Sequence, residues 1–152
     1  MSTRFTKKGV PMKNSMTLKL VQSAGLLQTR ISQMLVDELQ RRGYQTINIS
    51  RLAFLSTLEC GVNYASEVSR NLGVSRQMVA KTVKELCELG YLSQEKAVGK
   101  QKPIVFTLKG EQLIGECRNL LLALDEKLKT TSATTDLNQL VSDIQNFNKL
   151  LI

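Results

Sequence analysis

The stretch from residue 65 to residue 91 constrains the fold of this chain more than any other part of the sequence. Two sets of apolar residues recur there at the spacing of one helix face: Ala65, Val68 and Leu72 in the first set, and Val79, Val83, Leu86 and Leu89 in the second. Gly73 separates the sets and permits a tight turn, while Ser75 is a residue type that caps helix N-termini. The stretch therefore predicts a helix-turn-helix, in which Val74 anchors the corner and Gly90 ends the second helix.

The outward face of the second predicted helix carries polar and cationic side chains. Arg76 and Gln77 stand in its first turn, which is the part of a recognition helix that reaches base edges in the major groove. Arginine can form two hydrogen bonds with guanine, and glutamine can do the same with adenine, so this pair predicts base reading. Lys81, Lys84 and Ser75 are better placed to contact phosphates. The alternative interpretation is a solvated helix face that reads nothing.

Two short strands are predicted after this helix, at residues 92–96 and 104–108, and the second is rich in β-branched and aromatic residues. The segment between them, AVGKQKP, contains a glycine, a proline and the lysines Lys100 and Lys102. A basic hairpin that directly follows a recognition helix has the composition of a wing, which lies along the DNA backbone or enters the minor groove. The same composition also fits an ordinary hairpin turn.

Long amphipathic helices are predicted on both sides of this middle segment. Residues 17–42 and 113–128 repeat apolar side chains every three or four positions, and so does the stretch after Asp136. A shorter helix, capped by Asn48, is predicted over residues 49–58. The apolar stripes of the terminal helices either cover the middle segment or pair with a second copy of the chain. The middle segment is too small to bury them all, which favours a homodimer.

The predicted architecture is mainly α-helical with a small β-hairpin wing. We expect residues 1–14 to form a basic arm or a solvated tail, and residues 15–152 to form a single domain. TTSATT, at residues 130–135, predicts a break between the last two helices. Within the domain, the predicted dimerisation helices occupy residues 15–45 and 111–152, and the winged helix-turn-helix core occupies residues 46–110.

The charge of the chain is strongly positive and unevenly placed. Its 152 residues carry a net charge of +8, and the excess lies in the first 110 residues, because residues 111–152 hold four basic and six acidic side chains. A basic part joined to a mildly acidic tail indicates a polyanionic partner that meets one part of the molecule only. Double-stranded DNA is the polyanion that a helix-turn-helix predicts.

Several classes of protein are disfavoured by what the sequence lacks. It contains no histidine, no glycine-rich phosphate loop and no nucleophile with a base at recognisable spacing, so we expect no enzymatic activity and no catalytic residues. The wide spacing of Cys60, Cys87 and Cys117 disfavours a metal site or a disulfide framework and suits a reducing cytoplasm. No apolar stretch is long enough for a signal peptide or a membrane span, and we expect no cofactor.

The run from Ala65 to Leu113 resembles the DNA-binding core of the MarR family of bacterial regulators. The resemblance rests on the helix-turn-helix, on LCELGYL at residues 86–92, on the basic wing, and on FTLKGEQL at residues 106–113, which is close to the family's Leu-Thr-x-x-Gly. The long flanking helices also stand where that family dimerises. The wing departs from the family pattern, which usually has Asp-x-Arg there. Those positions are Val98 and Lys100 in this chain, so the ion pair that braces the wing is absent.

This resemblance implies a transcriptional regulator that binds, as a homodimer, a pseudo-palindromic DNA site near a promoter and blocks or assists polymerase. It also implies release by a small-molecule effector or by thiol oxidation at the junction of the dimerisation and DNA-binding helices. Cys60 precedes the helix-turn-helix and is the candidate redox sensor, whereas Cys87 and Cys117 fall at core-like helical positions. The remaining alternative is a winged-helix dimer that acts through protein–protein contacts and has no sequence-specific DNA site.

Overall fold

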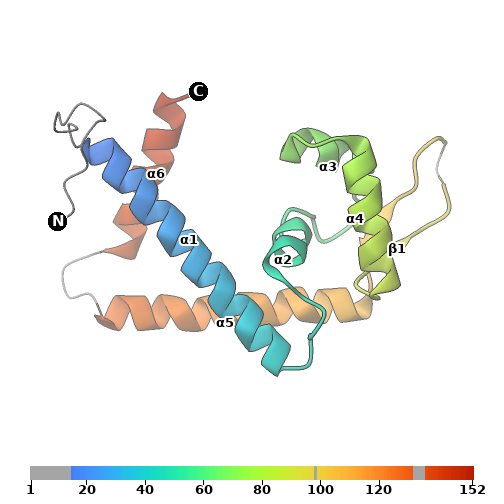
Figure 1. Ribbon diagram of the computed structural model, residues 1–152, viewed down its shortest axis with the longest axis horizontal. Helices are drawn as coiled ribbons and strands as arrows, with labels where there is room; N and C mark the ends of the chain where they lie inside the picture. Colours follow the sequence, from blue (N-terminus) through green and yellow to red (C-terminus); the bar gives the residue numbers. More distant parts are fainter. Residues whose placement is uncertain (1–14, 98, 132–135) are drawn as a thin grey trace, which may run out of the picture.

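The computed structural model describes residues 15–97, 99–131 and 136–152, so the predicted arm at residues 1–14, Val98 and most of the TTSATT break lie outside the described residues. The described chain contains six helices and one two-stranded hairpin (Figure 1). In chain order these are α1 (Met16–Arg41), α2 (Ile49–Leu55), α3 (Ala65–Leu72), α4 (Arg76–Glu88), β1 (Leu92–Gln94), β2 (Ile104–Phe106), α5 (Leu108–Thr131) and α6 (Leu137–Leu150). This mainly helical architecture with a small antiparallel hairpin confirms the predicted fold class.

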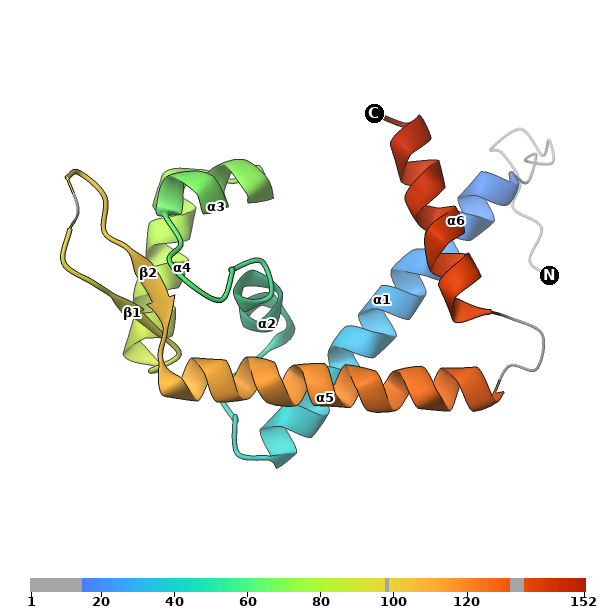
Figure 2. The same ribbon diagram turned by 180° about the vertical axis from the view of Figure 1, so that it is seen from behind.

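One hydrophobic core lies where α1 and α5 meet the helix-turn-helix and the hairpin. The C-terminal half of α1 and the N-terminal half of α5, called their inner halves below, supply the buried residues of these two helices. Its most deeply buried side chains come from most of these elements and from the loops between them: Leu39, Ile47, Leu55, Val79, Val83, Leu86, Tyr91, Ile104 and Leu113. Figures 1 and 2 show α5 running along the base of the molecule, crossed by α1, with the helix-turn-helix and the hairpin gathered at its N-terminal end. The inner halves of α1 and α5 therefore support the helix-turn-helix directly.

Side-chain caps fix where two of the predicted helices begin. At the start of α4, the hydroxyl oxygen of Ser75 accepts a hydrogen bond from the amide of Met78 at 3.1 Å. At the start of α2, the side-chain oxygen of Asn48 accepts one from the amide of Arg51 at 2.9 Å. Both predicted caps are confirmed, and both satisfy amides that no carbonyl of the same helix can reach. The turn between α3 and α4 needs Gly73, whose φ of 64° lies in the left-handed region.

The helices α2 and α3 differ from the sequence prediction in two details. Helix α2 ends at Leu55 rather than at residue 58, although Leu58 is still buried, because it lies in a turn that packs against the core. Leu72, expected on the buried face of α3, is 37% exposed. It is the last residue of α3 and lines an open groove between α2 and α4.

The hairpin and the two C-terminal helices also begin or end at other residues than predicted. Each strand is two residues shorter, and α5 already begins at Leu108. Thr107 starts this helix, because its hydroxyl oxygen accepts a hydrogen bond from the amide of Gly110 at 3.1 Å. Helix α5 runs on to Thr131, two residues into the predicted break, and Asp136 caps α6 as a new helix.

The N-terminal half of α1 and the whole of α6 carry large apolar side chains that are exposed in a single chain. Helix α6 has no buried residue, and α1 buries residues only in its C-terminal half. The exposed apolar side chains include Leu20, Val21, Leu26, Leu27, Leu140, Val141, Ile144, Phe147 and Leu151. An open groove of about 400 Å³ lies between the two helices, with Leu20 and Phe147 among its lining residues. None of the described helices is both long and apolar enough to cross a membrane.

Candidate nucleic-acid interface

The predicted recognition helix is α4, and its burial pattern decides which side chains face solvent. Val79, Val83 and Leu86 are at most 1% exposed and pack α4 against the core. Because these residues recur every three or four positions, the residues between them are directed away from the core. The predicted DNA contacts on this helix and at its cap are all exposed: Ser75, Arg76, Gln77, Lys81 and Lys84.

Within the described part of the chain, no carboxylate forms an ion pair with the cations of α4. The ion pairs found there join Arg41, Arg42, Arg51 and Lys129 to acidic partners, and none includes Arg76, Lys81 or Lys84. A basic side chain without an internal partner can bind a phosphate without first giving up an ion pair. The exposed face of α4 therefore has the charge needed to bind a polyanion.

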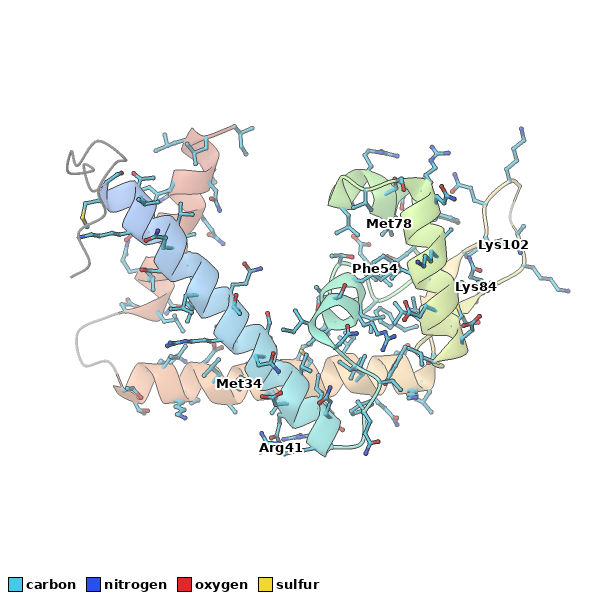
Figure 3. All side chains as sticks on the ribbon, viewed as in Figure 1. Met34, Arg41, Phe54, Met78, Lys84 and Lys102 are labelled. Atoms are coloured by element: carbon cyan, nitrogen blue, oxygen red, sulfur yellow. The ribbon has the colours of Figure 1, made fainter. Side chains whose placement is uncertain are left out.

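The hairpin β1–β2 packs beside α4 and carries the predicted wing (Figure 2). A hydrogen bond from the amide of Glu95 to the carbonyl of Pro103, at 2.9 Å, extends the strand pairing by one step. The loop beyond it projects away from the core and includes three exposed lysines: Lys96, Lys100 and Lys102. Figure 3 shows Lys102 on the wing and Lys84 on α4 at the same end of the molecule.

The structure adds two exposed cations to those that the sequence singled out. Arg70 lies in the last turn of α3, and Lys96 lies at the start of the wing loop. Neither takes part in an ion pair among the residues that the structure describes. The signal for both was the excess of basic over acidic residues between positions 61 and 110. Charge counting alone does not say which of these side chains share a surface.

The C-terminal end of α4 is held by side chains that precede or begin α5. Nζ of Lys109 donates a hydrogen bond to the carbonyl of Leu89 at 3.0 Å and lies 4.4 Å from the centroid of the Tyr91 ring. The hydroxyl of Thr107 donates to the carbonyl of Gly90 at 2.5 Å. A positive charge near the last carbonyls of a helix is favourable because it complements the helix dipole. Lys109 therefore differs from the other basic residues of this region by having a structural role.

The three cysteines differ in exposure. Cys60, the candidate redox sensor, is exposed, and Nη2 of Arg118 lies 3.6 Å from its sulfur. Cys87 is half-buried and Cys117 is buried, and burial raises the pKa of both thiols. Glu88 raises the pKa of Cys87 further, whereas Arg118 opposes the effect of burial at Cys117. No group of residues suited to hold a metal ion occurs among those that the structure describes.

Two hollows border α2. An open groove of about 290 Å³ separates α2 from α4, with Phe54, Leu72 and Met78 among its lining residues. A smaller hollow of about 190 Å³ lies between α2 and α5, with Leu58 and Cys117 among its lining residues. The second hollow is at the junction of the DNA-binding core and a predicted dimerisation helix, where the family resemblance implies an effector.

Comparison with solved structures identifies the fold of this chain. No protein-family model matches the sequence, and no curated protein matches it. Rv1404 from Mycobacterium tuberculosis is 14% identical, with a TM-score of 0.71 over 91% of this chain and 95% of that chain. Staphylococcus aureus MarR, in complex with salicylate and kanamycin, is 15% identical, with a TM-score of 0.68 over 88% and 89% of the two chains. The transcription regulator MepR of the same species, in complex with DNA, is 11% identical, with a TM-score of 0.67 over 92% and 100%.

These similarities extend beyond the winged helix. Each match covers at least 88% of this chain, so the long flanking helices are included. TM-scores of 0.67 to 0.71 show a shared fold, and at sequence identities of 11% to 15% they show the fold alone. The chain therefore has the winged-helix fold of the MarR-family transcription regulators, as its helix-turn-helix, its wing and its flanking helices predicted.

Proposed function

We propose that this protein is a sequence-specific DNA-binding transcriptional regulator and not an enzyme. The observation that carries the proposal is the exposed face of α4, whose cations have no ion-pair partner in the described part of the chain. A wing with further lysines stands next to it. MepR, which shares the fold, has been observed in complex with DNA.

Each DNA contact predicted from the sequence has a proposed role on this surface. Arg76 and Gln77, in the first turn of α4, would read base edges in the major groove. The contacts that hold the protein on the phosphate backbone would come from Ser75, Lys81 and Lys84. On the wing, Lys100 and Lys102 would be drawn to the negative potential of the backbone or the minor groove.

The proposed regulator acts as a homodimer on a pseudo-palindromic site. Residues 15–45 and 111–152 would form the dimerisation helices, and residues 46–110 the DNA-binding core. The exposed apolar surface of α1 and α6 supports this assembly, since Val21 is 64% and Phe147 is 50% exposed within a single chain. Two copies of α4, about 34 Å apart, would read two half-sites in successive major grooves. A dimer bound near a promoter would block or assist polymerase.

We further infer that the protein is cytoplasmic and that a small molecule controls its DNA binding. S. aureus MarR has been observed in complex with salicylate and kanamycin. In this chain, the hollow between α2 and α5 offers a site at the junction of the DNA-binding core and a proposed dimerisation helix. A ligand there would shift DNA affinity only if it bound the free and DNA-bound conformations with different affinities. Titration of the protein–DNA complex with salicylate tests this inference, and oxidation of Cys60 is the alternative signal.

The DNA-binding function is tested by selecting bound sequences from a random pool of duplexes. We expect an inverted repeat to be enriched, with an affinity at least about 10³-fold above that for random DNA. Arg76→Ala and Gln77→Ala should each relax the preference at one position of the half-site, where a good contact is worth about 1–3 kcal/mol. Lys127→Ala is the control, because Lys127 is exposed near the end of α5 that lies away from the wing (Figure 1).

Two outcomes would contradict this assignment at different levels. If no sequence were enriched and binding did not weaken with added salt, the DNA-binding proposal would fail, and a dimer acting through protein contacts would take its place. If an inverted repeat were enriched but neither Arg76→Ala nor Gln77→Ala changed the base preference, the regulator would stand and the base-reading residues would have to be reassigned.

A further inference from the structure

One arginine joins the recognition helix to the loop that follows α1. Arg51, in α2, donates from Nε to the carboxylate of Glu85 in α4 at 3.1 Å, and its Nη2 contacts the same oxygen. Its Nη1 donates to the carbonyl of Thr46 at 2.5 Å. The guanidinium therefore links three segments: α2, α4 and the loop at residues 42–48. Neither Arg51 nor Glu85 belongs to the DNA-contacting set proposed above.

A second contact joins the same loop to the end of α4. The hydroxyl oxygens of Thr46 and Tyr91 lie 2.9 Å apart. Tyr91 is fully buried, and its amide donates to the carbonyl of Leu86 at 2.9 Å, so it extends the C-terminal end of α4. Contacts at both Glu85 and Tyr91 restrict the tilt as well as the position of α4 relative to the loop.

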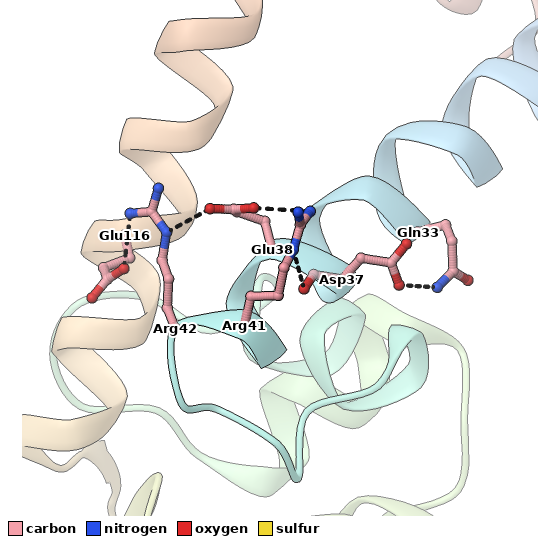
Figure 4. A network of polar contacts seen from close by, with 6 residues as sticks. All are labelled: Gln33, Asp37, Glu38, Arg41, Arg42 and Glu116. Atoms are coloured by element: carbon pink, nitrogen blue, oxygen red, sulfur yellow. Dashed lines mark hydrogen bonds and ion pairs between the residues drawn. The ribbon is translucent and has the colours of Figure 1, made fainter.

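The loop is tied in turn to the proposed dimerisation helices. Nε2 of Gln40, in α1, donates to the carbonyl of Ile47 at 2.7 Å. Arg42, the residue that follows α1, pairs with Glu38 and with Glu116 of α5, each at 3.1 Å (Figure 4). Polar contacts therefore tie the loop to α1 and α5 on one side and to the recognition helix on the other.

We propose that Arg51 is a positioning residue, which sets the angle of α4 relative to the dimerisation helices and thereby the half-site spacing that the dimer accepts. The proposal rests on the DNA-binding function proposed above. Arg76 lies about 13 Å along the helix from Glu85, at a rise of about 1.5 Å per residue. A tilt of about 10° at Glu85 would therefore move the base-reading turn by about 2 Å, a large part of the ~3.4 Å that separates base pairs.

The geometry of this contact requires arginine rather than lysine. Three N–H groups of one planar guanidinium reach two acceptors in different segments. A lysine ammonium is a point charge on a flexible stem and lacks this fork. Arg51→Lys therefore keeps the charge and loses the bridge. The double variant Arg51→Met/Glu85→Gln removes one charge of each sign, so it loses the bridge without changing the net charge.

The experiment measures affinity for duplexes in which the two selected half-sites keep the preferred spacing or are moved one or two base pairs closer or farther apart. We expect the wild-type dimer to bind the preferred spacing at least about tenfold more tightly than its neighbours, because each added base pair also rotates the half-site around the helix. In Arg51→Lys and in the double variant, this preference should fall to about threefold or less. The bases selected within a half-site should stay the same.

A matched control separates positioning from a general structural effect. Lys129→Met breaks the Lys129–Glu126 pair, at 2.9 Å, which lies within α5 and shares no residue with the contacts described above. It should leave unchanged the spacing profile, which is the affinity measured as a function of half-site spacing. Thermal unfolding of each variant establishes that it is folded at the assay temperature. A residue that only stabilises the fold would lower affinity by the same factor at every spacing.

The possible outcomes separate a failure of this inference from a failure of the DNA-binding function on which it rests. A broadened spacing profile in Arg51→Lys and in the double variant, with an unchanged profile in Lys129→Met, supports the positioning role. A sharp wild-type optimum that both Arg51 variants retain, or a uniform loss of affinity at all spacings, overturns the positioning role alone. A wild-type protein with no preferred spacing overturns the proposed dimeric binding mode and this inference with it.

Discussion

A Cβ atom added to Gly110 would lie 2.2 Å from the carbonyl oxygen of Tyr91, closer than a carbon and an oxygen can approach without a bond. It would also lie 2.9 Å from Cδ1 of Phe106. Gly110 is in the first turn of α5, so this helix packs directly on the backbone that leaves the recognition helix. The close approach explains why glycine stands at this position of the strand-to-helix junction.

Replacing Gly110 should therefore destabilise the fold. We expect Gly110→Ala to lower the free energy of unfolding by about 1–3 kcal/mol, because neither the backbone of Tyr91 nor the start of α5 can move without disturbing the core. Urea unfolding followed by circular dichroism measures the change. Gly115→Ala is the matched control in the same helix, where a Cβ would meet nothing within 4 Å. It should raise stability by up to about 1 kcal/mol through helix propensity, and equal losses in both variants would refute the steric explanation.

Variants of Ser75 separate its role as the cap of α4 from its proposed role as a phosphate contact. Ser75→Ala removes the acceptor for the amide of Met78 and should cost about 1 kcal/mol of stability. Ser75→Asp keeps an acceptor at the cap, so stability should stay near that of the wild type, while the new negative charge should weaken DNA binding. Thermal unfolding and DNA titration measure the two effects. Wild-type affinity in Ser75→Asp would mean that no phosphate comes close to this cap.

Lys100 at the wing should contribute to DNA binding without regard to sequence. We expect Lys100→Ala to weaken binding to all duplexes and to reduce the slope of log affinity against log salt by about 0.9 for each protomer, as for one lost phosphate contact. Titrations between low and moderate salt give the slope, and Lys127→Ala should leave it unchanged. An unaltered slope in Lys100→Ala would place the wing tip away from the DNA backbone.

A charge on the exposed apolar face of α6 should dissociate the proposed dimer. Phe147 is 50% exposed and lines the groove between α1 and α6, so Phe147→Asp would place a carboxylate in an apolar interface. We expect a monomer by analytical ultracentrifugation, with helix content retained because α6 contributes no buried residue to the core. Asn146→Asp adds the same charge to the same helix and should stay dimeric. Unchanged association of Phe147→Asp would rule out this face as the interface.

The three cysteines should react with a maleimide at different rates in the native protein. The thiolate is the reactive form, and burial raises the pKa of Cys87 and Cys117, so both stay protonated at neutral pH. We expect Cys60, which is exposed, to be modified first, as mass spectrometry of the labelled protein can follow. In denaturant the three rates should converge. Loss of DNA binding on oxidation that Cys60→Ser prevents would support the redox alternative, and modification of Cys117 before Cys60 would contradict the order.

The sequence pattern predicted the helix-turn-helix well because its signals are local. Ser75 caps a helix through an amide three residues away, and Gly73 adopts its turn conformation without help from distant segments. The hairpin ends and the start of α5 were predicted less well. The end of β2 and the start of α5 depend on Thr107, which contacts Gly90, a residue 17 positions away in the sequence. A pattern of apolar spacing carries no information about such contacts.

The sequence by itself determined where most helices lie, which residues cap two of them, and which face of α4 is cationic, because these features follow from residue types within one or two turns. Only the tertiary structure decided what each charged side chain does. Arg51 forms an ion pair with Glu85, 34 positions away, and Lys109 donates a hydrogen bond to the carbonyl of Leu89 at the end of α4. Lys81, in contrast, has no carboxylate partner among the described residues. These differences depend on which distant segments the packed core brings together, and that packing is a property of the whole chain.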